Sequence, residues 1–138
     1  MRRLAAAIAL SALGLLAGPG PASAHHSFAM YDQTRTVTLK GAIKSFLWTN
    51  PHVVIWLVGA PTTGGSPQTW TIELTSPGNL TRIGWSRTSL KVGDAVEVQI
   101  LPLRDGQPGG AFKSAKILAT GQVLNANWVQ QSQTGGHQ

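Results

Sequence analysis

Apolar and polar residues alternate one by one along several segments of the chain, a period of two that β-strands produce and helices do not. These segments cover residues 34–48, 52–59, 69–75, 95–101 and 112–124. Stretches rich in Gly and Pro at residues 60–68 and 104–110 read as hairpin loops, and Gly41 marks a bend or bulge in the first strand. The sequence therefore predicts an all-β domain.

The stretch between the third and fourth predicted strands has the composition of a short helix. Ser76 suits the N-cap, Pro77 the first helical position, and Gly84 can end the helix after about two turns. The predicted order is three strands, a helix and two more strands, and the last strand is broken near residues 120–121. This is the order of the OB-fold, a partly open barrel. We expect a five-stranded OB-like barrel with one short helix between strands three and four; a small β-sandwich is the alternative.

The first 24 residues have the three parts of a secretory signal peptide. Arg2 and Arg3 provide the positive start, residues 4–17 form an uncharged run rich in Ala and Leu, and residues 22–24 form a small-x-small cleavage site. A transmembrane anchor is the alternative, but a span needs about 20 apolar residues and this run is shorter. We expect an exported protein, periplasmic or secreted, with no stable membrane insertion after cleavage.

Beyond the leader (1–24), we expect an OB-like barrel domain at residues 25–129 and a polar, Gly-rich, disordered tail at residues 130–138. The chain has no cysteine, which excludes disulfides, zinc–thiolate sites, iron–sulfur clusters and covalently attached haem. Without the two leader arginines, 9 basic side chains oppose 5 acidic ones, a net charge of +4. This modest charge does not specify nucleic acid as a partner, and export argues against it.

Cleavage after the leader would make His25 the first residue of the mature chain. An N-terminal His offers its α-amine and its ring Nδ1 to one metal ion, and a nitrogen from a distant His completes a histidine brace. Nitrogen-only, near-planar coordination favours Cu(II) over zinc, calcium or magnesium. His26 can also bind copper, as a fourth or competing ligand. The alternative is that the His pair is a frayed polar chain end.

The segment after the His pair is unusually apolar for a free chain end. Phe28, Met30 and Tyr31 are predicted to pack it onto the domain, which would hold His25 in place. A single Met here is more typical of packing than of a soft metal ligand.

Two polar residues are predicted on the outer face of the sheet. His52 follows a turn with Pro and shares a face of the second strand with Trp56, and antiparallel pairing brings Glu73 of the third strand to the same side. We hypothesise a copper site of the His25 α-amine, its Nδ1 and His52, in which Glu73 accepts an imidazole N–H and fixes its tautomer. The alternatives are a turn histidine bonded to backbone, and a glutamate that is solvated or paired with a nearby Lys.

Among the five tryptophans, Trp48 and Trp56 are candidates for a ring-stacking face that binds a sugar, another small ligand or a periplasmic partner protein. Core packing is the alternative for most of the tryptophans. Catalysis has little support, because the chain shows no Ser/His/Asp order, no paired carboxylates and no Gly-rich phosphate loop. We therefore predict copper carriage or buffering, with a metal-free ligand- or partner-binding OB module as the alternative.

Five short motifs are spread over the mature chain between about residues 25 and 124: His25-His26-Ser27-Phe28, Asn50-Pro51-His52, Trp70-Thr71-Ile72-Glu73, Gly84-Trp85 and Gly93-Asp94. In these motifs the chain resembles a bacterial family of small exported proteins known only as a domain of unknown function. The His pair and the Asn-Pro-His segment are the most distinctive parts. The resemblance implies export, size and fold, and it implies no particular activity.

Overall fold

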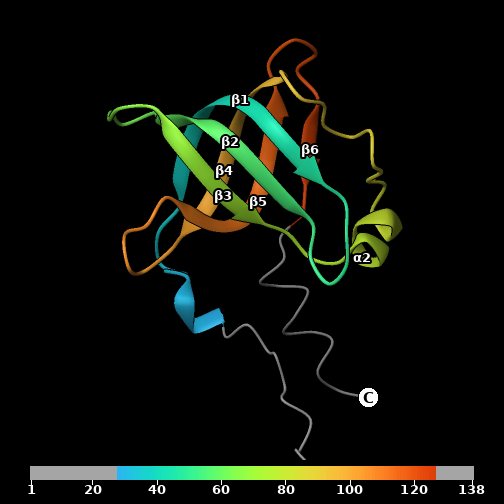
Figure 1. The fold of residues 1–138 in the computed structure, drawn as a ribbon, viewed down its shortest axis with the longest axis horizontal. Coiled ribbons are helices and arrows are strands. Elements are labelled where there is room, and N and C mark those ends of the chain that lie inside the picture. The colour runs from blue at the N-terminus through green and yellow to red at the C-terminus, as the bar shows by residue number, and fades with distance from the viewer. Residues whose placement is uncertain (1–27, 127–138) are drawn as a thin grey trace, which may run out of the picture.

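The fold is that of a computed structural model, which describes residues 28–126. Its elements in chain order are η1 (Phe28–Met30), β1 (Val37–Leu47), β2 (Val54–Pro61), β3 (Gln68–Glu73), α2 (Pro77–Arg82), β4 (Ala95–Pro102), β5 (Gly109–Ile117) and β6 (Val123–Asn125). Figure 1 shows the strands wrapped around a common interior, with the 3-10 helix η1 and the α-helix α2 toward the same end of the barrel. None of the helices among residues 28–126 is both long and apolar enough to span a bilayer.

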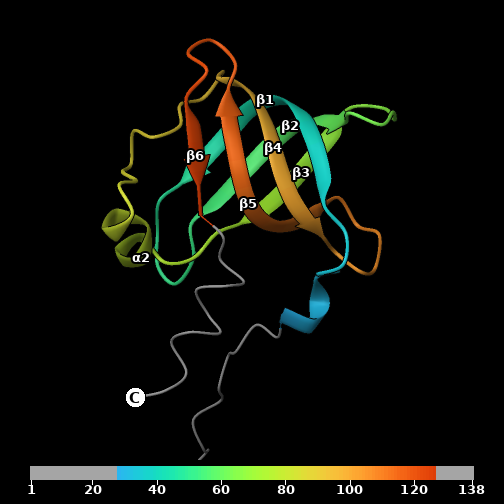
Figure 2. The ribbon, with the colours of Figure 1, turned by 180° about the vertical axis from the view of Figure 1, so that it is seen from behind.

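Five strands form a closed ring. β1 pairs antiparallel with β2 and β4, β2 with β3, and β4 with β5, while a parallel contact between β3 and β5 closes the barrel. The prediction of an all-β, OB-like barrel of five strands with a short α-helix after the third is confirmed. The sandwich alternative is wrong, and the barrel is closed rather than partly open. β6 lies outside the ring and pairs with β5 (Figure 2).

The segment predicted as a fifth strand over residues 112–124 forms two strands, β5 and β6. Between them Gly121 adopts φ 75°, in the left-handed region that Gly occupies without strain. Its N–H donates to the carbonyl oxygen of Ile117 at 2.8 Å, which closes the turn. The predicted break is therefore confirmed, and the prediction of a single strand around it is wrong. β5 also begins earlier, at Gly109, because its first residues pair with β3.

The inward face of the barrel follows the predicted alternation. Its fully or nearly fully buried side chains include Leu39, Ile43, Ile55, Leu57, Ile72, Val96, Val98, Ile100 and Phe112. Burying one such side chain contributes about 2 kcal/mol to folding. Trp70 also packs inside, and its indole N–H donates to the Gly59 carbonyl oxygen at 3.0 Å.

The helix α2 has the predicted cap. The Ser76 side chain accepts the N–H of Asn79 at 3.3 Å, and Gly84 follows the helix with φ 91°. Thr75 lies two residues after Glu73 within the predicted third strand, where alternation would turn it outward, but it is buried. The strand has already ended there and the chain is turning into α2, so the Thr75 hydroxyl accepts a hydrogen bond from the Asn79 side-chain amide at 2.9 Å.

A second, smaller apolar cluster lies on the outer face of the barrel. Tyr31, Leu101 and Ala111 are buried there, with Phe28 and Leu103 packed against them. The Met30 carbonyl oxygen accepts the Arg104 N–H at 2.9 Å, which fixes the segment to the connection after β4. Phe28 and Tyr31 thus pack as predicted. The packing prediction for Met30 is wrong, because its side chain is 42% exposed.

Gly41 of β1 and Gly59 of β2 face each other across the two strands. A Cβ atom on Gly41 would press against the Val58 carbonyl oxygen and lie 2.7 Å from the Gly59 Cα. The predicted bulge at Gly41 lies instead between Ile43 and Ser45. Glycine is therefore needed at position 41 for the close approach of two backbones.

Candidate functional site

His52 lies in the connection between β1 and β2, just after the cis peptide bond of Asn50–Pro51. The next residue, Val53, is buried, and its N–H donates to the Thr75 carbonyl oxygen at 3.1 Å, so backbone pairing with the neighbouring chain begins here. Since neighbouring residues alternate between faces, His52 presents its side chain to the outer surface. The predicted second strand from residue 52 is wrong at its start, because β2 begins at Val54.

Glu73, the last residue of β3, stands on the same outer face. It pairs with Val54 on one side and Ala111 on the other, and its chain neighbours Ile72 and Leu74 are buried inside. Its Oε1 contacts Nδ1 of His52. Both side chains are mostly buried, 23% exposed for the histidine and 21% for the glutamate. The structure thus brings these two predicted site residues together.

Tyr31 completes this group from the N-terminal side. Its hydroxyl donates to Oε2 of Glu73 at 2.8 Å, and the side chain is only 2% exposed. Sequence reasoning placed Tyr31 in a packing role and missed this polar contact. The available signal was that the chain's single tyrosine stands in an otherwise apolar segment near the predicted mature terminus. We refer to Tyr31, Glu73 and His52 as the outer-face triad.

The triad sets the chemistry of the imidazole. A carboxylate has no hydrogen to donate, so Nδ1 of His52 carries the hydrogen that points at Glu73. In the neutral ring the lone pair then belongs to Nε2. Glu73 in turn has each of its oxygens bonded to a different donor. This arrangement presents a nitrogen with a defined orientation, able to act as a metal ligand or as a base.

Burial raises the pKa of the Tyr31 hydroxyl well above its ordinary value of 10.0, and the hydrogen bond to the negatively charged Glu73 raises it further. The unfolded chain therefore loses this proton at a lower pH than the folded protein. Tyr31 contributes its full stabilisation below pH 10.0 and loses it as the pH rises above that value.

We therefore expect the difference in unfolding free energy between the wild type and Tyr31→Phe to shrink above about pH 10, by at most about 1.4 kcal/mol per pH unit. Urea unfolding of both proteins from about pH 9 to about pH 11.5 measures this difference. Absorbance of the single tyrosinate gives an independent check. If the tyrosine ionised at the same pH in the native and the urea-unfolded protein, Tyr31 would not be buried and hydrogen-bonded to Glu73 in the native state.

The two candidate tryptophans differ in their surroundings. Trp48 packs edge-on against the ring of Phe46, with 5.8 Å between centroids, and contacts the barrel core. Trp56 projects from the outer face of β2 and is partly exposed. The residues that share its face, Val54 and Val58, are also apolar. An apolar row on β2 therefore begins beside His52 and Glu73, and we call Val54, Trp56 and Val58 the β2 row.

The predicted terminal ligands His25 and His26 lie outside the described residues, as do Trp128 and His137. Within residues 28–126, no three His, Cys, Asp or Glu side chains are grouped so as to hold a metal ion. Of the predicted copper ligands His25, His26 and His52, only His52 therefore lies among the described residues. The coordination itself stays a prediction.

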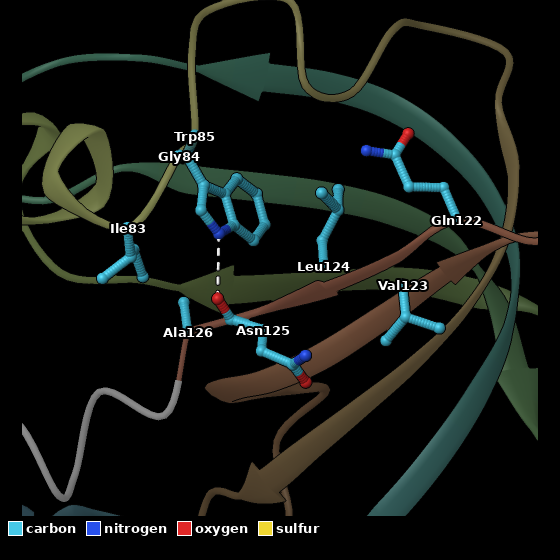
Figure 3. Close-up of a pocket in the computed structure, with 8 residues that line it drawn as sticks. All are labelled: Ile83, Gly84, Trp85, Gln122, Val123, Leu124, Asn125 and Ala126. Atoms are coloured by element: carbon cyan, nitrogen blue, oxygen red, sulfur yellow. Dashed lines mark hydrogen bonds between the residues drawn. The ribbon is translucent and has the colours of Figure 1, made fainter.

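A groove of about 470 Å³, with no triad residue among the residues that line it, lies between the end of α2 and β6 (Figure 3). Its lining residues are Ile83, Gly84, Trp85, Gln122, Val123, Leu124, Asn125 and Ala126. The Trp85 indole N–H donates to the Asn125 carbonyl oxygen at 2.9 Å, which ties the strand to the segment after the helix. The described residues that line the groove include no carboxylate and no imidazole, so they offer no chemistry comparable to that of the triad.

The fold and the triad define a small OB-like β-barrel protein with a hydrogen-bonded histidine, carboxylate and tyrosine on its outer face. The chain belongs to a family of unknown function, DUF6152, whose family model matches residues 12–129. The matched region is wider than the resemblance found in the motifs, and it starts within the predicted leader. No curated protein matches the chain, and no solved structure does.

Proposed function

We propose that this protein is an exported copper-binding protein that holds one Cu(II) ion at its processed N-terminus, for copper carriage or buffering. The ligands are the α-amine and Nδ1 of His25 together with His52, and His26 is a fourth or competing ligand. The observation that carries the proposal is the contact between His52 Nδ1 and the Glu73 carboxylate. Glu73 does not bind the metal in this account.

Metal-binding histidines nearly always donate their second ring N–H to a carboxylate, a backbone carbonyl or water. This contact fixes the tautomer and the ring orientation and makes the metal-facing nitrogen more basic. His52 and Glu73 have this arrangement, with Nε2 as the nitrogen that carries the lone pair. An ordinary turn histidine bonded to backbone has no need of a mostly buried carboxylate, so the contact favours the metal-site interpretation.

The reach of the chain also supports the proposal. Tyr31 donates a hydrogen bond to Glu73, the glutamate that contacts His52. His25 lies six residues before Tyr31 in the sequence. Six residues span at most about 22 Å when fully extended. The α-amine of a mature chain starting at His25 is therefore attached to a segment that is fixed beside the triad.

The donor set favours copper. An amine and two imidazoles supply nitrogen alone, which suits the tetragonal preference of Cu(II), while calcium and magnesium require oxygen ligands. The α-amine has an ordinary pKa of about 7.7, so copper can displace its proton near neutral pH. An exported protein with this site would exchange copper with a periplasmic partner protein or a small ligand.

A single residue added before His25 tests the proposal, because it converts the α-amine into an amide and leaves every side chain in place. We expect Cu(II) affinity, measured by competition with a chelator of known strength, to fall on the order of 100-fold or more. A direct ligand costs at least as much as the residues that orient one, which are worth about 10–100-fold. Equal affinities in the two proteins, each confirmed by mass, would contradict the proposal.

A second candidate function is the binding of an apolar or aromatic ligand, or of a partner protein, without metal. The β2 row favours it, because outward residues of a soluble barrel are usually polar, and strands two and three form the binding face of many OB-folds. This function predicts that Trp56→Ala abolishes ligand binding, and that a residue added before His25 has no effect on it.

A further inference from the structure

We propose that Tyr31 is a positioning residue that couples the seating of the N-terminal segment to the orientation of His52. The inference rests on the proposed function for its relevance to copper, but the coupling itself belongs to the metal-free protein. Tyr31 acts through Glu73, which contacts both the Tyr31 hydroxyl and the His52 ring.

Tyr31 is bound to the barrel by its backbone and by its ring. It forms an isolated β-bridge with Leu103, and its ring is buried in the outer-face cluster with Leu101 and Ala111. These contacts fix the position of the hydroxyl relative to the end of β3, because Ala111 is the direct neighbour of Glu73 in the sheet.

The Tyr31 hydroxyl then restricts Glu73. A glutamate side chain at a strand end has three rotatable bonds and loses substantial conformational freedom when it is fixed. The 2.8 Å bond from Tyr31 to Oε2 holds one oxygen, which leaves Oε1 directed at His52. Without the hydroxyl, Glu73 keeps the charge but loses the second anchor, so the carboxylate samples other rotamers and the Nδ1–H tautomer of His52 loses its advantage.

The same bond also connects the described start of the N-terminal segment to the glutamate that contacts His52. Phe28 packs against the cluster that holds Tyr31, and His25 lies three residues before Phe28 in the sequence. A seated N-terminal segment therefore places Tyr31, orients Glu73 and selects the metal-ready form of His52 in one step. When the N-terminal segment is not packed against the barrel, neither the terminal amine nor His52 is positioned to bind copper.

Long-range ¹H–¹⁵N spectra of histidine-labelled, metal-free protein test the coupling, because the two ring nitrogens report the tautomer directly. We expect one dominant Nδ1–H form of His52 in the wild type and a mixture of tautomers in Tyr31→Phe, which keeps the ring but lacks the hydroxyl. Phe28→Ala, which removes apolar packing against the cluster that holds Tyr31 but keeps the hydroxyl, the carboxylate and the imidazole, shifts the mixture in the same direction. Trp70→Phe is the matched control, since it removes a different buried hydrogen bond and leaves the His52 tautomer unchanged.

Copper titration gives the second readout. Tyr31→Phe is expected to weaken Cu(II) binding about 10-fold, at the lower end of the cost for a residue that orients a ligand. The coupling is overturned if His52 keeps the wild-type tautomer in both Tyr31→Phe and Phe28→Ala. It is also overturned if Trp70→Phe changes the His52 tautomer ratio as much as these two variants do. If the tautomers change as expected but the wild type binds no copper, the coupling stands and the proposed function fails.

Discussion

Replacing His52 by alanine is expected to abolish tight Cu(II) binding, with a loss in affinity on the order of 100-fold or more. The substitution removes the proposed ligand from the barrel, and removing a ligand costs at least as much as removing the 10–100-fold contribution of a residue that orients it. The α-amine and ring of His25 remain, so weak binding persists. Competition with a chelator measures the difference, on protein that begins at His25.

Two histidine variants control for the loss of any imidazole. His137→Ala removes a histidine from the C-terminal tail and should leave the affinity unchanged, while His26→Ala should have a smaller effect than His52→Ala. Thermal unfolding of each variant shows whether the barrel is intact. Wild-type affinity in a folded His52→Ala protein would mean that the His25–His26 pair binds copper without the barrel, and that the triad has another role.

Replacing Gly41 by alanine is expected to destabilise the barrel by about 3 kcal/mol, the upper end of the usual cost of overpacking. The new methyl group would press against the backbone of β2 at Val58 and Gly59, and backbone atoms in a paired strand cannot turn aside as a flexible side chain can. Urea unfolding followed by tryptophan fluorescence measures the free energy.

Gly78→Ala is the matched control for this substitution. Gly78 lies in α2, and a Cβ atom there meets nothing within 4 Å. Alanine in a helix is favoured over glycine by about 0.5–1 kcal/mol, so this variant should be slightly more stable than the wild type. If both variants had the same stability, the close approach of β1 and β2 at Gly41 would be refuted.

Much of the barrel could be predicted because its signals are local. Alternation identifies the buried face of each strand, and Ser76-Pro77 marks the start of α2 where the chain leaves the third strand. The division of the last segment into β5 and β6 was only partly visible, since a turn at Gly121 has a weak signal when apolar residues continue on both sides. The closure of the barrel depends on a parallel contact between β3 and β5, which no local pattern encodes.

The candidate site could be predicted in part. The shared face of His52 and Glu73 follows from alternation, but the contact between them depends on register, which in turn is set by the backbone pairing at Val53 and Val54. Tyr31 could not be assigned, because its contact with Glu73 spans 42 residues and requires the segment to cross the outer face of the barrel. A phenol in an apolar segment gives the same sequence signal whether it packs or donates a hydrogen bond.

We propose that the processed N-terminus and His52 bind one copper ion together. Electron paramagnetic resonance during Cu(II) titration tests it most directly, on protein confirmed by mass to begin at His25, with the one-residue extension and His52→Ala alongside. We expect a single nitrogen-rich spectrum that saturates at one equivalent of copper in the wild type and is lost or altered in both comparison proteins. Identical weak spectra from all three proteins would contradict it and direct attention to the β2 row as a ligand-binding face.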